Sequence, residues 1–312
     1  MMKRLIIIFV VLSAGMLHSR KSYSQHDPMF TNYMWNEMYI NPAYAGSREA
    51  LSLVALHRQQ WVGMDGAPIT QTLSLHGPFF ENRAGLGLSF LHEGIGVSNE
   101  SSFMGTFAYH IQTSETARLS FGLSGGVITL REKLSEIETK TPGDVHFLTN
   151  TPLIVMPNSS FGMYYYTKKF YVGFSTPRMI TNVITPGTWK VDNTLNVKNI
   201  HYHLISGYVF DLQDGIKLKP TMMLRSIYAA PIEISTSVNV FFKDRIWAGL
   251  AYRTGNSISV LLAVQVNPYL RFGYSYDYTA SRLSKFNSGS HEINIGYDYP
   301  LGKRKTVSPR LF

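Results

Sequence analysis

The stretch LRFGYSYDY, residues 270–278, alternates two kinds of side chain without a break. Its even-numbered residues are apolar or aromatic, and its odd-numbered residues are charged, small or polar. Residues 232–242 (IEISTSVNVFF) and 293–299 (INIGYDY) show largely the same alternation. In a β-strand, successive side chains point to opposite faces, so one face of each segment suits lipid and the other a wet lumen. The pattern predicts transmembrane strands.

The same period continues toward the N-terminus in segments of about ten residues, the length that transmembrane strands need. We count fourteen candidate strands, an even number, as single-chain bacterial barrels have. They are expected to begin near Leu51, Ile69, Ala84, Ser101, Thr116, Asn158, Lys168, His201, Gly215, Pro231, Asp244, Ser257, Tyr269 and Gly289. The predicted fold is all-β, a transmembrane up-and-down antiparallel β-barrel of about 14 strands.

Composition favours this fold over a helical membrane protein or a secreted β-sandwich. Only 16% of the 312 residues are charged, below the roughly 25% of soluble domains. No apolar run after the N-terminus is long enough for a helical span. The chain is rich in strand-forming aromatics and in turn-forming glycine, with 19 Tyr, 18 Phe and 25 Gly. Aromatic residues gather at the strand ends, as they do at the two lipid–water boundaries of a barrel.

The connections between the candidate strands alternate in length. Those near Glu115, Thr167, Gln213, Lys243 and Asn267 are short, whereas residues 131–157 and 176–200 form long connections. Barrels of the outer membrane have short periplasmic turns and long outer loops. We therefore expect both termini in the periplasm, and the proline-containing stretches around Pro142, Pro152, Pro177 and Pro186 outside the cell.

Four regions are expected along the chain. A basic start, the apolar run 5–17 and small residues at Ser22 and Ser24 indicate a signal peptide over residues 1–24, cleaved near Ser24. Residues 25–50 form an N-terminal periplasmic or plug segment, residues 51–300 the barrel, and residues 301–312 a basic tail. The chain has no cysteine, so neither disulfides nor a lipid-acceptor thiol are expected. The expected location is the bacterial outer membrane.

Two stretches resemble a known family. The first is QHDPMF (residues 25–30) through MWN (34–36) to INPAYAGS (40–47), and the second is RQQWVG (58–63) with GAP (66–68), TQT (70–72) and HGP (76–78). Together they resemble the mature start of the PorP/SprF family. The resemblance implies a role in type IX secretion of cargo with a C-terminal sorting domain, and in some members in gliding. It implies periplasmic partners, the PorK/PorN ring, which the PorL/PorM motor energises.

The segment 25–47 lacks lipid-facing alternation and concentrates aromatic side chains. Such side chains are costly unless they are covered, either by a partner or, if the segment is a plug, by the lumen of the barrel. Nearby, Trp61 could be a boundary aromatic or an interface anchor, and residues 41–46 also read as a turn. The candidate partner-binding residues are Phe30, Tyr33, Trp35, Tyr39, Asn41, Pro42, Tyr44, Arg58 and Trp61.

Motifs of catalysis and metal binding are weak. GLSGG, residues 122–126, fits the G-x-S-x-G elbow, but it lies in an alternating segment instead of a strand–turn–helix unit. His201 and His203 share a strand face without a third ligand. We expect no enzyme activity, no metal, no cofactor and no nucleic-acid partner. The alternatives are a channel for hydrophobic small molecules and, with Ser124 as nucleophile, a hydrolase inside the barrel.

Overall fold

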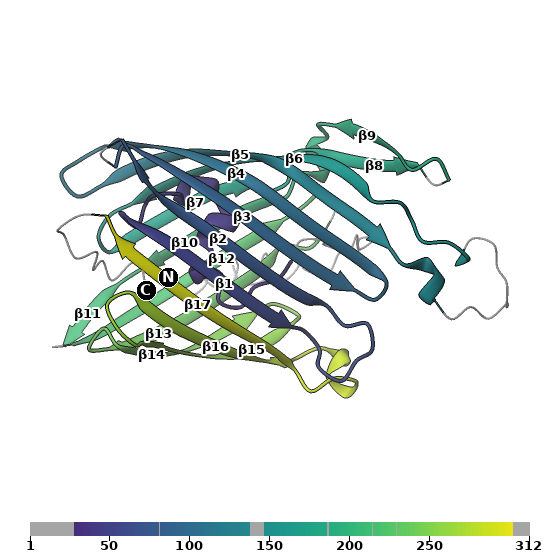
Figure 1. Cartoon of the computed structure of the whole chain (residues 1–312). Coiled ribbons are helices and arrows are strands. Elements are labelled where there is room, and N and C mark those ends of the chain that lie inside the picture. The colour runs from purple at the N-terminus through teal and green to yellow at the C-terminus, as the bar shows by residue number, and fades with distance from the viewer. Residues whose placement is uncertain are drawn as a thin grey trace, which may run out of the picture.

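The computed structural model describes residues 28–80, 82–137, 147–185, 187–213, 215–228 and 230–301. The expected signal peptide and nearly all of the basic tail lie outside these residues. In the described part, antiparallel strands follow one another in chain order around a closed barrel (Figure 1). They are β1 (Ala50–Gln59), β2 (Ile69–Phe79), β3 (Ala84–Ile95), β4 (Ser98–Gln112), β5 (Arg118–Glu132), β6 (Ile154–Tyr166), β7 (Phe170–Thr176), β10 (Tyr202–Tyr208), β11 (Phe210–Gln213), β12 (Ile216–Ser226), β13 (Glu233–Phe242), β14 (Ile246–Arg253), β15 (Ser257–Gln265), β16 (Leu270–Thr279) and β17 (Ser290–Pro300).

The barrel closes at two places. β1 pairs with β17 along its whole length, from Ala50 opposite Pro300 to Gln59 opposite His291. β10 pairs with both β7 and β12, and β11 continues the line of β10 beyond Val209. With β10 and β11 taken as one interrupted strand, the described residues form a barrel of fourteen strands. The predicted transmembrane barrel is confirmed, and each strand begins at or within a few residues of its predicted start.

The two faces of the wall follow the alternation that the sequence predicts. On β13, Ser235, Ser237 and Asn239 are buried in the lumen, whereas Ile234 and Val238 are exposed on the outside. On β15, Ser257 and Ser259 are likewise buried, with Leu261 and Ala263 further along the same face, and the outward residues Ile258, Val260, Leu262 and Val264 are exposed. An apolar outer face is what the hydrocarbon core of a bilayer requires.

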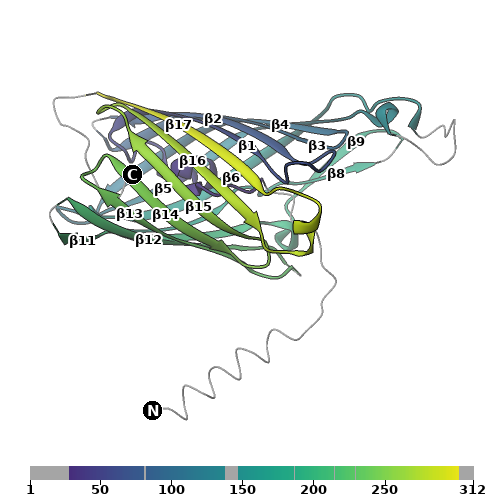
Figure 2. The ribbon, with the colours of Figure 1, turned by 90° about the horizontal axis from the view of Figure 1, so that it is seen from below.

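The two ends of the barrel differ. One, the short-turn end, carries tight connections such as those at residues 167–169 and 243–245. The other, the long-loop end, carries the connection between β5 and β6, described at residues 133–137 and 147–153, and the connection between β7 and β10. The second of these loops holds an unpredicted hairpin, β8 (Thr181–Thr185) and β9 (Lys190–Thr194), which projects beyond the barrel (Figure 2). Ile184, Trp189 and Val191 pack the hairpin on an apolar cluster of β5 and β6.

Residues 28–49, here called the strap, lie inside the barrel, where Figure 1 shows them as the purple segment. The strap contains η1 (Tyr33–Trp35), α2 (Glu37–Ile40) and η2 (Pro42–Tyr44), which begins with Pro42 in the first turn, where its missing N–H costs nothing. Among the described residues, no helix is long and apolar enough to cross a membrane.

The direction of the strap corrects one expectation. Met29 contacts Asn256, in the turn between β14 and β15 at the long-loop end. Arg48, at the other end of the strap, contacts Asp298 near the end of β17. The first described residue and the end of the last strand therefore lie at opposite ends of the barrel. Both termini were expected in the periplasm. For the described residues this expectation is wrong, because the strap crosses the lumen before β1 begins and the two ends of the described chain lie at opposite ends of the barrel.

Candidate functional site

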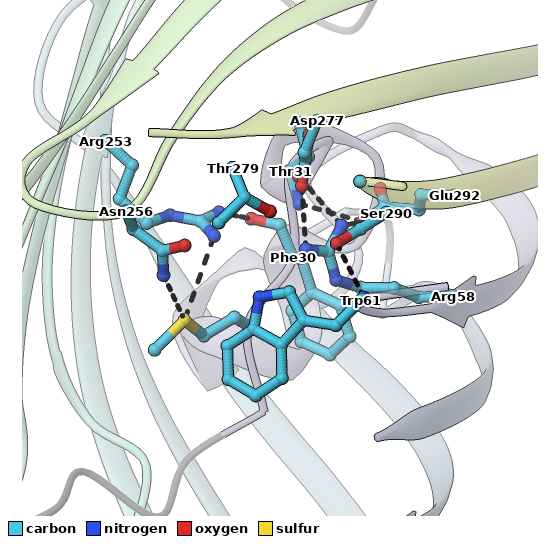
Figure 3. Close-up of polar contacts among 12 residues, drawn as sticks. Phe30, Thr31, Arg58, Trp61, Arg253, Asn256, Asp277, Thr279, Ser290 and Glu292 are labelled. Carbon is cyan, nitrogen blue, oxygen red and sulfur yellow. Dashed lines mark hydrogen bonds and ion pairs between the residues drawn. The ribbon is translucent and has the colours of Figure 1, made fainter. Parts of the chain in front are cut away.

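The strap and the wall that surrounds it form the candidate site. At the long-loop end, the backbone N–H groups of Thr31 and Asn32 donate to the Glu292 carboxylate at 2.8 and 2.9 Å (Figure 3). The Thr31 hydroxyl donates to Asp277 at 2.6 Å, and Arg58 pairs with Asp277 at 2.7 Å and with Glu292 at 3.3 Å. We call these four residues, Thr31, Arg58, Asp277 and Glu292, the outer clamp. Because its charges are buried and mutually paired, it meets the condition for burying charge in a protein.

Further wall residues bind the first residues of the strap. Arg253 donates to the Phe30 carbonyl at 2.7 Å and approaches the Met29 sulfur, which also lies 3.4 Å from the Asn256 amide (Figure 3). Arg253 is in turn 3.6 Å from Glu233, which also pairs with Arg225. Arginine charges of the wall are thus balanced by carboxylates of the wall.

At the short-turn end, the strap is held by a charge of its own. Arg48 binds Asp298 through two nitrogens, at 2.6 and 3.0 Å, and Asp298 also accepts from Ser52 at 2.6 Å and lies 3.2 Å from Arg271. We call Arg48, Ser52, Arg271 and Asp298 the inner anchor. Burial is the largest single influence and lowers the pKa of Arg48, but the contributions of Asp298 and Tyr44 together outweigh it, so the net pKa of Arg48 lies above its ordinary value. The guanidinium stays charged.

Glycines of the opposite wall make room for the strap. Gly85 on β3, Gly122 on β5 and Gly162 on β6 lie against the backbone or side chains of residues 41–46, and a Cβ atom at any of them would overlap the strap. At Gly173 on β7, a Cβ would lie 2.7 Å from the Asn41 amide nitrogen. The Asn41 amide donates to the Met163 carbonyl of β6 at 2.9 Å, and Ser175 donates to the Ile40 carbonyl at 2.7 Å. The NPAYAG segment therefore sits directly on the wall of the barrel.

Aromatic and polar side chains of the strap fill the middle of the lumen. Tyr33 hydrogen-bonds Thr221 of β12 at 2.6 Å, and Asn36 bonds Thr72 and Ser74 of β2. Trp35 packs on Trp247 of β14, with 5.7 Å between ring centroids, and under the Arg271 guanidinium. Since the strap contacts strands on every side of the barrel, it occupies the cross-section of the lumen.

A narrow recess remains beside the outer part of the strap. It is lined by Phe30, Tyr39, Ser102, Asn158, His203 and Arg225, among other residues. The side chains come from the strap and from β4, β6, β10 and β12. The lining mixes apolar and hydrogen-bonding groups, and the described residues contain no group of three or more His, Cys, Asp or Glu that could hold a metal ion.

The structure places most of the predicted partner-binding residues inside the barrel. Those that it buries are Phe30, Tyr33, Trp35, Asn41, Pro42, Tyr44 and Arg58, and Tyr39 is partly buried against them. Of the two kinds of cover that the sequence leaves open, the described structure shows the second, because the lumen of the barrel covers these aromatics. Binding of a partner by them stays a prediction, and it would require them to leave the lumen. Trp61 lies at the mouth of the barrel and is half-buried, and its backbone N–H donates to the Ser290 hydroxyl at 3.1 Å.

The weak catalytic match lies in a strand. Ser124 is in the middle of β5, opposite Ser160 on β6, and its hydroxyl shares a 2.7 Å hydrogen bond with Thr106. A nucleophile elbow needs a sharp turn between a strand and a helix, which residues 122–126 do not form. In the same motif, Gly122 is one of the glycines that accommodate the strap.

Reasoning from the sequence missed the wall residues that hold the strap. Asp277, Asp298 and Glu292 stand out as charges on lumen faces of predicted strands, and this was the one available signal. Nothing local indicates that they meet Thr31 or Arg48, since 261 residues separate Thr31 from Glu292.

Comparison with known proteins finds one family. The family described as "Type IX secretion system membrane protein PorP/SprF" matches residues 22–297, and no curated protein matches the chain. Among solved structures, the chain is similar to the CymD monoaromatic hydrocarbon channel, at 11% identity and TM-score 0.50, over 88% of this chain and 93% of that one. It is also similar to the Acinetobacter baumannii outer membrane protein Omp33, at 7% identity and TM-score 0.48, over 80% and 98%. At 11% identity, the likeness to CymD shows the barrel fold alone.

Proposed function

The chain belongs to the PorP/SprF family of type IX secretion system membrane proteins, and from this premise we propose that it is a non-enzymatic outer-membrane component of that machinery. Its task in this proposal is to link the outer membrane to the periplasmic PorK/PorN ring, and through it to the PorL/PorM motor, and to support export of cargo with a C-terminal sorting domain. A role in gliding adhesin export belongs to the same proposal.

One observation of the fold carries the choice of a structural role over a transport channel. The strap fills the cross-section of the lumen and is tied to strands all round it, through Tyr33 to β12, Asn36 to β2 and Trp35 to β14. A channel for hydrophobic small molecules needs a path along the lumen, whereas a membrane anchor for other proteins needs a rigid barrel. A plugged barrel serves the second need.

The proposed orientation puts the short-turn end in the periplasm, where the ring would dock, and the long-loop end outside the cell. The chain has no cysteine, so single cysteines report their side cleanly. Asn196→Cys, at the long-loop end, should react with a membrane-impermeant maleimide on intact cells. Lys168→Cys, at the short-turn end, should react only after the outer membrane is opened. The reverse result would overturn the orientation.

The secretion role is tested by deleting the gene in a strain without a second copy of the family. Sorting-domain cargo should accumulate in the periplasm, and wild-type protein should restore its delivery to the surface. Normal surface delivery of every such cargo protein would contradict the proposal. If the deletion instead abolishes uptake of a hydrophobic compound while secretion stays normal, the channel alternative is correct.

A further inference from the structure

The strap divides near Trp35 into two parts that are held in different ways. The outer part, residues 28–34 (PMFTNYM), contains no charged residue. It gives the wall only neutral groups: the N–H groups of Thr31 and Asn32, the Thr31 hydroxyl, the Tyr33 hydroxyl and the Phe30 carbonyl. The charged side chains that hydrogen-bond to it, those of Arg58, Arg253, Asp277 and Glu292, all belong to the barrel.

Those wall charges pair with one another as well as with the strap. The Arg58 guanidinium lies 2.7 Å from the Asp277 carboxylate and 3.3 Å from the Glu292 carboxylate, and the Arg253 guanidinium lies 3.6 Å from the Glu233 carboxylate. If the outer part of the strap leaves, each of these ion pairs remains. Departure therefore breaks neutral-to-charged hydrogen bonds but strands no buried charge, which is the most costly outcome in a lumen.

The rest of the strap has no such freedom. Asn36 is bound by Thr72 and Ser74, and residues 41–46 lie on the glycines of β3, β5 and β6. Three charges belong to this part itself: Glu37, which accepts from the Tyr164 hydroxyl, Arg48 of the inner anchor, and Glu49, which pairs with Arg118. Its removal would leave Asp298 without its closest cation. This part is fixed.

The outer part also has a route out. Met29 already lies at the long-loop end beside Asn256, and Phe30 borders the recess next to the strap (Figure 3). Movement toward the long-loop end meets no wall strand, since the strands run beside the strap and not across it.

We propose that the strap is a hinged gate. Residues 28–34 swing out of the lumen at the long-loop end, while residues 36–48 stay in place, and the hinge lies between Met34 and Asn36. The open state has a vestibule on the long-loop side that joins the present recess to the space of Phe30 and Tyr33. Its base stays closed by the fixed part, so the open gate makes no hole across the membrane.

Cysteine reactivity in the purified, folded full chain tests the gate. Asn32→Cys reports on the outer part and Ser47→Cys on the fixed part; both side chains are buried in the closed state. A small maleimide should modify Asn32→Cys at least about tenfold faster than Ser47→Cys. Adding Glu292→Ala, which removes the acceptor of two backbone N–H groups, should speed Asn32→Cys by a further factor of about ten and leave Ser47→Cys unchanged, since charge-assisted hydrogen bonds of this kind shift an equilibrium by that order.

Glu100→Ala is the matched control. Glu100 pairs with Arg178 at the same end of the barrel, and within the described part of the chain it makes no hydrogen bond or ion pair with the strap. It should leave both rates unchanged. Equal rates at the two cysteines, or an equal rise at both with Glu292→Ala, would show that they are reached only by unfolding of the whole barrel and would overturn the gate. So would an Asn32→Cys that stays unreactive in both backgrounds. Heat-modifiable migration on a detergent gel verifies that each variant is folded.

Discussion

The two sides of the lumen hold the same strap by opposite means. The wall of β3, β5, β6 and β7 presents glycines, and the strap lies directly on its backbone. The wall of β1, β16 and β17 presents long charged side chains that reach across to the strap. A plug can thus be held on one side by glycines, which leave room for its backbone, and on the other side by ion pairs and charged hydrogen bonds. The first means depends on shape, and the second depends on every charge keeping its partner.

The largest loss of stability is expected when the charge of Arg48, which belongs to the strap, is removed. Arg48→Ala leaves Asp298 buried with Arg271 alone, and breaking a buried pair in this way costs about 3–5 kcal/mol. We expect the free energy of unfolding, measured by urea titration of the barrel in lipid vesicles, to fall by that amount. Arg118→Ala is the control, because its pair with Glu49 is partly exposed and should contribute less than about 1 kcal/mol. Similar losses in the two variants would refute the distinction.

On the wall of β3, β5, β6 and β7, we expect an added side chain to destabilise the barrel by steric overlap with the strap. Gly122→Ala places a Cβ against the backbone of Ala43, so the strap must shift, at an expected cost of about 1–3 kcal/mol. The displaced strap should also raise ion conductance in a planar bilayer. Gly125→Ala, three residues along the same strand, is the matched control, because a Cβ there meets nothing within 4 Å. If both variants behave like the wild type, close packing on this wall does not hold the strap.

The outer clamp should respond least, because the strap contributes only neutral groups to it. Thr31→Val removes the hydroxyl that donates to Asp277 but keeps the shape of the side chain and the ion pair of Asp277 with Arg58. We expect a loss of about 1.5 kcal/mol, the lower end of the range of about 1.5–3 kcal/mol for a hydrogen bond to a charged group, because Arg58 still pairs with Asp277. Urea titration measures it. A loss as large as that of Arg48→Ala would mean that the outer clamp is as essential as the inner anchor.

Much of the barrel could be predicted from short stretches of sequence. The segment 270–278 and its relatives show which side chains face outward and where each strand begins. The hairpin β8–β9 was not predicted, because it lies in a loop and its short strands carry polar residues on both faces at most positions. The candidate site was recognised only in part. The aromatics of the strap stood out as side chains that need covering, whereas the glycines that receive them look like any other strand glycine.

Alternation depends on a residue and its nearest neighbours, since each strand has lipid on one face and the lumen on the other. The sequence alone therefore determined the barrel, its strands and the faces of the wall. It left open whether residues 25–47 bind outside the barrel or fill it, because the lumen does not exist until β1 meets β17 and β10 meets β12. Closure brings Glu292 to Thr31 and Asp298 to Arg48 across more than two hundred residues. The position of the strap, and which of its parts is fixed, come from that closure.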